Sequence, residues 1–277
     1  MHALLDPFAE PFMRRALIEL LLLGVAGSLV GCWVLLYELA YSTESLAHAL
    51  FPGLVVAALL GLPLLAGGAA GVLVGATAIA LVARTPVIGR DTGIAVVITS
   101  LFGVGVVLAL SPSAPPGLET LLFGDLLGVT RGDLVISGVL VAATAVSVVA
   151  LHRPLLVAGF DRGNAAAFGA RPFLVDAALL VLIAVGVLVG VQALGNLLVI
   201  AMLVGPAAGA RRLVERLPAM MGLAILLAWA AALAGLFLSY YLDVAAGAAV
   251  ASATVALFLV AALAGAVRTP DRRRRQG

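Results

Sequence analysis

Long apolar runs, separated by only short polar breaks, are the feature that most constrains how this chain folds. A helix that crosses a bilayer needs about 20 mainly apolar residues. By that measure, candidate spans lie at residues 16–37, 44–62, 64–83, 93–110, 133–151, 172–191, 194–210, 218–239 and 244–266. Because several of these runs are short or closely joined, the sequence predicts an all-α, polytopic integral membrane protein with eight or nine transmembrane helices.

The composition leaves little room for a soluble domain. Of the 277 residues, 64% are hydrophobic and 11% are charged, whereas about a quarter of the residues in soluble domains are charged. We expect a short N-terminal segment at residues 1–15, a transmembrane domain at residues 16–267 and a basic cytoplasmic tail at residues 268–277.

The basic residues indicate the orientation of the chain. All 16 are arginine, and the sequence contains no lysine. Cytoplasmic loops carry an excess of basic residues. With nine spans and the N-terminus outside, 13 of the 16 arginines fall on the cytoplasmic side. A P-loop needs a lysine on the phosphates, so any ATP hydrolysis that this protein uses must reside on a partner chain, and we do not expect the chain itself to be an enzyme.

Glu44 and His48 are two ionisable residues four positions apart inside an apolar stretch. On a helix they share a face, where a carboxylate and an imidazole can bind one divalent cation from the same side. Pro52 lacks an N–H, so the carbonyl of His48 loses its helical partner and becomes a possible third ligand. The alternative interpretation is an interhelical hydrogen bond or ion pair that only fixes packing.

Glycines recur at four-residue spacing, at Gly27 and Gly31 and at Gly67, Gly71 and Gly75. Small residues at this spacing let helices approach closely in lipid. The alternative is that they reflect a composition rich in glycine and alanine.

The inner segment at residues 152–171 is the longest cytoplasmic loop, and within it residues 160–169 are predicted to form a short helix. Such a helix, with phenylalanine at its edges, suits docking of a partner, although an ordinary amphipathic linker remains the alternative. The docking residues that we expect are Phe160, Asp161, Asn164, Ala165, Phe168 and Gly169.

Five sequence blocks carry a resemblance to one family. They lie at residues 31–53, 90–94, 122–130, 195–212 and 235–247. The blocks follow one another in the order that the family shows. Through them the chain resembles the permease subunits of bacterial ABC importers for zinc, manganese or iron, and it is most similar to the zinc-uptake permeases. The family usually has aspartate where this chain has Glu44, which lengthens the reach by one methylene.

The resemblance implies a multi-pass permease of the bacterial plasma membrane. It implies a homodimer with a second permease copy, cytoplasmic ATP-binding subunits docked on the inner loop, and an extracytoplasmic metal-binding protein. Glu44 and His48 would line the path of a divalent metal ion, zinc first and then manganese or iron. The metal would be the transported substrate, with no permanently bound cofactor and no nucleic-acid partner.

Two other functions stay open. One is a permease for iron chelates or cobalamin, which would share the architecture but does not call for a Glu–His pair in a narrow path. The other is a stand-alone secondary transporter or channel, which often shows internal repeats.

Among other polar residues, we expect an interfacial cap or local ion pair at Asp91, and hydrogen bonds between helices or contacts to the path at Asp176, Gln192 and Asn196.

Overall fold

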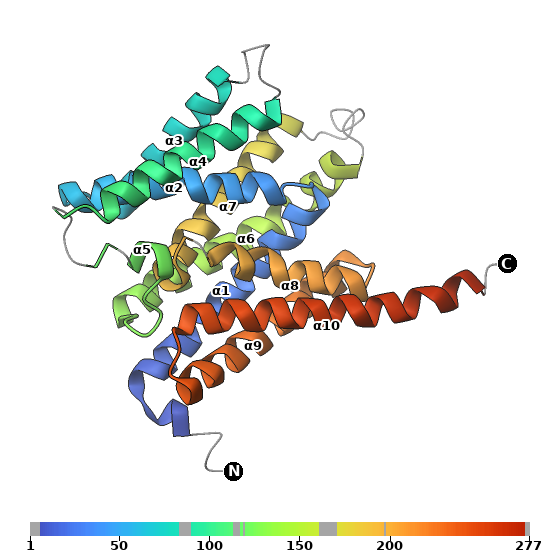
Figure 1. The fold of residues 1–277 in the computed structure, drawn as a ribbon. Coiled ribbons are helices and arrows are strands. Elements are labelled where there is room, and N and C mark those ends of the chain that lie inside the picture. The colour runs from blue at the N-terminus through green and yellow to red at the C-terminus, as the bar shows by residue number, and fades with distance from the viewer. Residues whose placement is uncertain are drawn as a thin grey trace.

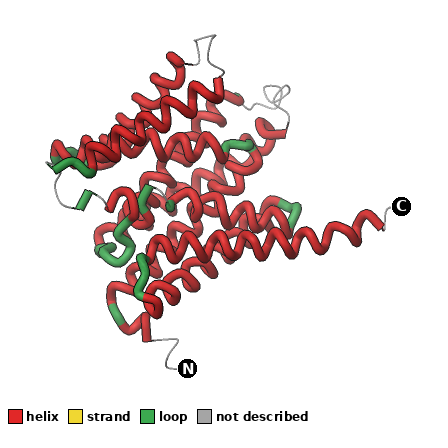
Figure 2. Tube along the Cα trace, in the orientation of Figure 1, coloured by secondary structure: helices red, strands yellow, loops and turns green. Residues whose placement is uncertain are grey.

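The computed structural model describes residues 6–82, 90–112, 117–118, 120–160, 171–196 and 198–274. Throughout these ranges the regular structure is helical and no strand occurs (Figure 2). After a short 3-10 helix, η2 (Asp6–Ala9), the chain forms α1 (Pro11–Leu36), α2 (Ala40–Leu60), α3 (Leu64–Val82), α4 (Arg90–Ala109), α5 (Thr120–Phe123), α6 (Arg131–Phe160), α7 (Pro172–Leu194), α8 (Val199–Leu213), α9 (Leu217–Leu242) and α10 (Ala246–Arg274). The predicted all-α class is therefore confirmed.

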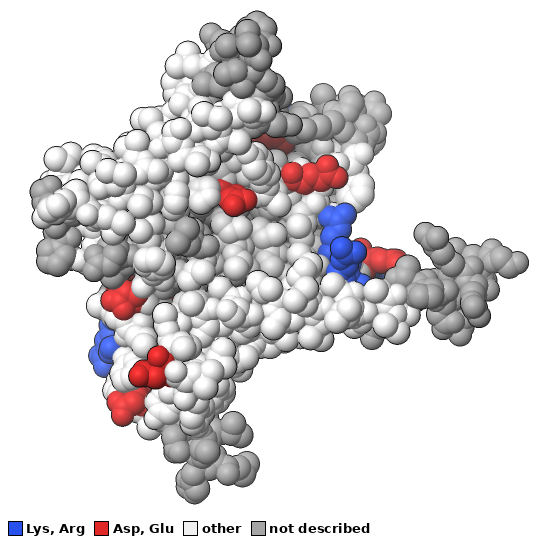
Figure 3. Space-filling view, viewed as in Figure 1, with Lys and Arg blue, Asp and Glu red and all other residues white. Residues whose placement is uncertain are grey.

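The long helices pack around α1, which contacts α6, α7, α8 and α9. In its most apolar window 67% of the residues are buried, against 22% in α4, α6 and α10. Helices α2, α3 and α4 pack together on one side of the molecule, and α8, α9 and α10 on the other (Figure 1). Leu73, Val107, Val149 and Leu263 are exposed, and Figure 3 shows wide surfaces without charge. These surfaces suit contact with lipid.

The number of membrane spans corrects the sequence prediction. Within the described residues, seven helices are long and apolar enough to cross a membrane, namely α1, α2, α4, α6, α7, α9 and α10. Within α3, the apolar stretch Ala66–Ala78 is shorter than the seven spans and is not counted among them. Helix α8 has 15 residues, which is about 22 Å of helix against a hydrocarbon core of about 30 Å. The expected count of eight or nine is too high by this measure.

Helix α8 is short because the chain leaves helical geometry before it begins. The sequence predicted one span over residues 194–210, but α7 continues to Leu194 and Gly195 then has a φ of 77°. Glycine adopts such a backbone readily. A Cβ at Gly195 would also collide with the carbonyl oxygen of Leu122. The turn therefore lies against the backbone around α5, and α8 starts only at Val199.

Glycines bring pairs of helices into close contact, as their spacing predicted. A Cβ on Gly31 of α1 would collide with the carbonyl oxygen of Leu203 on α8. Gly53 of α2 lies against the backbones of Gly67 and Gly71 on α3. Since backbone faces backbone at both crossings, no side-chain rotation can make room, and the position of α2 relative to α3 is fixed.

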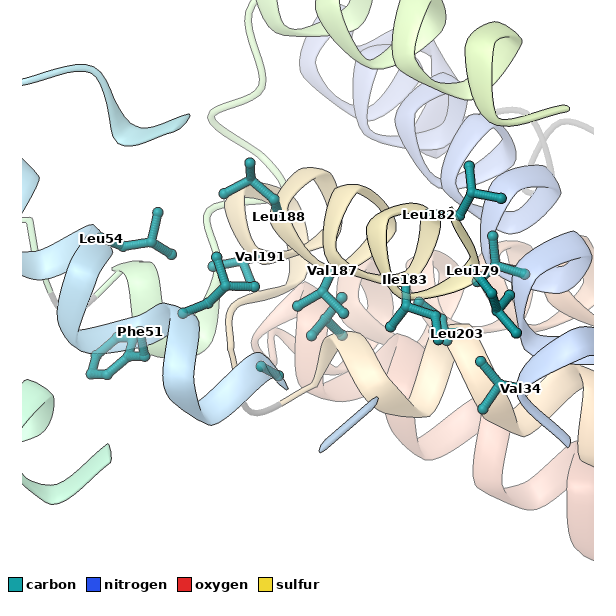
Figure 4. Packing of buried hydrophobic residues seen from close by; sticks show 14 of the residues in the cluster. Val34, Phe51, Leu54, Leu179, Leu182, Ile183, Val187, Leu188, Val191 and Leu203 are labelled. Atoms are coloured by element: carbon teal, nitrogen blue, oxygen red, sulfur yellow. The ribbon is translucent and has the colours of Figure 1, made fainter. Parts of the chain in front are cut away.

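The central core joins α2, α7 and α8 (Figure 4). Ile183, Val187 and Val191 of α7 belong to one buried cluster with Phe51 of α2 and Leu203 of α8. Between helices in lipid, such packing gains van der Waals contacts and not removal from water. The core holds α2, which carries the Glu44–His48 pair, against the centre of the bundle.

The two ends of the bundle carry different elements (Figure 1). The N-terminus, α5 and the start of α10 lie at one end, and the turn between α8 and α9 lies at the other, together with the C-terminus. Arg211 and Arg212 lie in the last turn of α8. In the orientation that the arginines predict, the α5 end faces outward and the α8–α9 turn faces the cytoplasm.

Candidate functional site

Glu44 and His48 lie on one face in the first turns of α2. Nε2 of His48 is 3.8 Å from Oε1 of Glu44. The Glu44 side chain is 56% exposed and the His48 side chain is 24% exposed. The carboxylate is therefore more accessible than the imidazole. The separation exceeds a hydrogen bond. Both groups therefore keep lone pairs that a cation could use.

The turn between α1 and α2 sets where the pair begins. Glu38 takes a positive φ of 58° in this turn. In the first turns of α2, the Thr43 hydroxyl donates to the carbonyl oxygen of Leu39 at 2.9 Å, and the Ser45 hydroxyl donates to that of Tyr41 at 2.7 Å. Both hydroxyls are thus used within the helix, and the acid and the imidazole remain as the groups that can serve a ligand.

Phe102 of α4 positions the imidazole of His48. The two ring centroids are 4.6 Å apart with an interplanar angle of 53°, and Phe102 contacts Phe51 of α2 at 5.3 Å. Nδ1 of His48 is buried and has no hydrogen-bond partner among the described residues. Aromatic contact therefore holds the ring, and Nε2, which faces Glu44, is the nitrogen that a metal ion could reach.

Helix α2 continues through Pro52 without a break. Because proline has no N–H, the carbonyl oxygen of His48 has no helical donor four residues further on. In the part of the chain that the structure describes, no three His, Cys, Asp or Glu side chains lie close enough together to coordinate one bare metal ion directly. A transition-metal ion usually takes four or more ligands, so the pair supplies only part of a coordination shell.

The predicted docking segment is described only at its start. Phe160 ends α6, and its side chain is 77% exposed. The other five expected docking residues, Asp161, Asn164, Ala165, Phe168 and Gly169, lie outside the described residues. Helix α6 passes through Pro154 and extends beyond the predicted span end at residue 151.

Asn196 is 1% exposed and is more buried than Asp176, the other secondary polar candidate whose side chain the structure describes. Its backbone N–H donates to the carbonyl oxygen of Leu121 at 2.9 Å. Its side-chain oxygen and nitrogen have no hydrogen-bond partner among the residues described. Asp176 lies near the start of α7, and the side chains of Asp91 and Gln192 lie outside the description.

Sequence reasoning did not single out Glu19, which lies within α1 and is 2% exposed. The hydroxyl of Ser137 on α6 donates to its Oε1 at 2.6 Å. An acidic residue inside an apolar run of membrane length was the available signal, but only the fold brings Ser137 to it. Thr130 and Asp133, which precede and open α6, form reciprocal cap bonds.

Comparison with known proteins gives consistent matches over nearly the whole chain. Residues 9–265 match the model of the ABC 3 transport family. The chain is 30% identical over 258 residues to a "probable iron transport system membrane protein" of Haemophilus influenzae, covering 93% of this chain and 95% of the relative. It is also 30% identical over 252 residues to a "manganese transport system membrane protein MntC" of Halalkalibacterium halodurans, covering 90% and 86%.

Solved structures agree with the fold. One chain of "PsaBC from Streptococcus pneumoniae in complex with Fab" superposes with a TM-score of 0.87 at 28% identity, covering 93% of this chain and 94% of that one. A putative metal-chelate type ABC transporter in an inward-facing conformation superposes with a TM-score of 0.62 at 17% identity, covering 90% and 86%. The second likeness concerns the fold alone.

Proposed function

Because this chain belongs to the ABC 3 transport family, we propose that it is the membrane-spanning permease subunit of an importer that moves a divalent transition-metal ion into the cytoplasm. The observation that carries this proposal is the Glu44–His48 pair, 3.8 Å apart on α2 in a chain with few ionisable groups in its spans. Polar groups at membrane depth are expensive and mark ion pathways.

The two side chains would divide the work on the ion. The carboxylate of Glu44 offsets the charge of a divalent cation in a poorly solvated site, and the imidazole of His48 favours transition metals over Mg²⁺ or Ca²⁺. Phe102 keeps the imidazole in place without using its nitrogens. The pair binds modestly, because a transit site must also release its ion.

A second copy of the permease would complete the site. One chain offers two side-chain ligands, and the more exposed of them, Glu44, has more than half of its side-chain surface accessible. A two-fold axis beside α2 would bring two carboxylates and two imidazoles together, which matches the four ligands that such ions usually take. This supports a homodimer in which the ion passes between the copies.

The other partners are cytoplasmic ATP-binding subunits and an extracytoplasmic metal-binding protein. The ATPase would dock on residues 160–169. Of these, Phe160 is described, and it ends α6 at the end of the bundle that carries Arg211 and Arg212 (Figure 1). The absence of lysine from the sequence supports a separate ATPase, because a P-loop needs one.

Manganese and iron are the metals in the names of the relatives reported above, and zinc remains a prediction from the sequence resemblance. All three ions accept mixed nitrogen and oxygen ligands. Uptake of Mn²⁺, Fe²⁺ and Zn²⁺, each measured alone and against an iron chelate in a strain without other importers, would rank the substrates. Preference for the chelate would overturn the proposal of bare-ion transport.

The site is tested by uptake of radioactive Mn²⁺ in cells that carry the complete importer. Glu44→Gln and His48→Ala are expected to reduce uptake at least about tenfold, since each removes a ligand. Glu38→Gln is the matched control, because Glu38 is an exposed acid in the turn just before α2. Membrane insertion and recovery of the ATPase should be normal in all three. Normal uptake by His48→Ala would refute the assigned role.

A further inference from the structure

A cavity of about 240 Å³ opens at the α5 end of the bundle, distinct from the Glu44–His48 pair. Three of its lining residues are acids from two helices and the connection between α5 and α6. The lining consists of Glu19, Asp125 and Asp133 together with Leu64, Leu121, Gly128, Val129 and Ala193. Figure 3 shows acidic side chains on the surface at this end of the molecule, as well as others at the opposite end.

Glu19 is the observation that points to a ligand. Its side chain lines the cavity although the residue is only 2% exposed. Ser137 occupies Oε1, whereas Oε2 is buried and has no hydrogen-bond partner among the described residues. Arg15, one turn earlier on α1, forms no ion pair with Glu19 in the described part of the chain. A buried carboxylate oxygen without a partner is unfavourable, so the carboxylate is suited to a partner that the chain does not supply.

The two aspartates are held at the cavity wall by local bonds. Oδ1 of Asp125 accepts the N–H of Gly128 at 3.0 Å. Oδ2 of Asp133 accepts the N–H and the hydroxyl of Thr130 at 2.9 and 2.7 Å. Asp133 lines the same cavity as Glu19, so the two acidic side chains face one common space. Three acids so placed create a negative potential inside the cavity, which a cation would relieve.

The cavity suits an ion that keeps part of its water shell. The three carboxylates are not grouped tightly enough, among the described residues, to coordinate one bare ion. The volume of about 240 Å³ is many times the roughly 10–15 Å³ that one water needs. Divalent cations such as Mg²⁺ and Mn²⁺ favour oxygen ligands and often keep several waters.

The geometry points to a second cation site, in which Glu19, Asp125 and Asp133 bind a partly hydrated divalent cation at the outer end of the permease. In the orientation predicted from the arginines, this is the end from which an ion arrives. The site would hold the ion before it reaches Glu44 and His48, and only this last step rests on the proposed function.

The test measures binding of Mn²⁺ alone to the assembled importer in nanodiscs, from the electron paramagnetic resonance signal of free Mn²⁺. The variants are made in the His48→Ala background, so that the pair on α2 does not dominate the signal. Glu19→Gln removes the buried charge while its amide oxygen can still accept the Ser137 hydroxyl. Glu10→Gln is the matched control, because Glu10 is an exposed acid just before α1 that does not line the cavity.

In the His48→Ala background, we expect Glu19→Gln to weaken Mn²⁺ binding at least about tenfold, because it removes a buried charge. Asp125→Asn should weaken binding about two- to threefold, because Asp125 is exposed and screened. Glu10→Gln should leave the affinity unchanged. Because the readout is binding, it remains interpretable even if His48→Ala proves to transport normally and the proposed path on α2 fails.

Unchanged Mn²⁺ affinity in Glu19→Gln overturns the site, whatever the aspartate variants do. Unchanged Mn²⁺ affinity with weaker association of an extracytoplasmic partner also overturns it, because the acids would then serve basic side chains of that partner. If Glu19→Gln fails to assemble, as judged by gel filtration, the double variant Asp125→Asn, Asp133→Asn decides. Wild-type affinity in that variant overturns the proposal.

Discussion

Replacing Gly53 with alanine tests whether α2 is held where the structure places it. A Cβ on Gly53 would lie 2.7 Å from the backbone nitrogen of Gly71 and 2.8 Å from its Cα, and closer still to the carbonyl oxygen of Gly67. Ordinary van der Waals contact begins at 3.4 Å, so α3 would have to retreat by at least 0.7 Å (3.4 − 2.7). All the obstructing atoms belong to the backbone and cannot rotate away.

The expected loss follows from two opposing effects. Overpacking a tight contact costs about 1–3 kcal/mol, whereas alanine is favoured over glycine within a helix by about 0.5–1 kcal/mol. The net destabilisation of Gly53→Ala should be roughly 1–2 kcal/mol, which changes the ratio of folded to unfolded protein about 5- to 30-fold. The assay is unfolding of the purified permease in mixed micelles of increasing SDS content, followed by circular dichroism.

Gly103→Ala on α4 is the matched control, because no described atom lies within 4 Å of the added Cβ. It should be as stable as the wild type or slightly more stable. Since His48 lies about one turn before Gly53, we also expect Gly53→Ala to displace the imidazole from Phe102 and reduce metal uptake. Equal stability of the two alanine variants would refute the reasoning, because it would mean that α2 and α3 are not in backbone contact.

Three further predictions concern single side chains. Tyr37→Phe removes the hydrogen bond of 2.7 Å from the Tyr37 hydroxyl to the carbonyl oxygen of Leu155, and the free energy of unfolding should fall by about 0.5–1.5 kcal/mol in the SDS assay; an unchanged value would show that the bond adds nothing. Thr130→Ala removes the cap that bonds to Asp133, and the free energy of unfolding should fall by about 1 kcal/mol. Because the cap acts locally, the loss of hydrogen-exchange protection should be confined to the first turn of α6. Glu44→Asp keeps the charge but shortens the reach by one methylene, so uptake should persist with a changed ratio of Mn²⁺ to Zn²⁺, and an unchanged ratio would exclude direct contact between this carboxylate and the ion.

The sequence predicted the features that depend on local geometry. The places of the long helices followed from the apolar runs, and the shared face of Glu44 and His48 followed from helical periodicity. The close approach at Gly31 followed from small residues at fixed spacing.

The features that depend on contacts between distant segments could not be predicted. Glu19 and Ser137 are 118 positions apart, and the contact of His48 with Phe102 depends on how α4 packs against α2. The late start of α8 depends on Gly195 meeting the backbone of Leu122. No single-helix pattern contains this information, because it arises from the crossing of helices. The expected ATPase-docking role of residues 160–169 remains a prediction.

The central claim is that His48 contacts the transported ion. Pulsed electron paramagnetic resonance of Mn²⁺ bound to the assembled importer measures this directly, because a coordinated histidine nitrogen modulates the electron spin echo. We predict ¹⁴N modulation in the wild-type importer that disappears in His48→Ala and persists in His152→Ala, in which the histidine that packs against Trp33 is replaced. Modulation that is absent from the wild type, or unchanged in His48→Ala, would contradict the account.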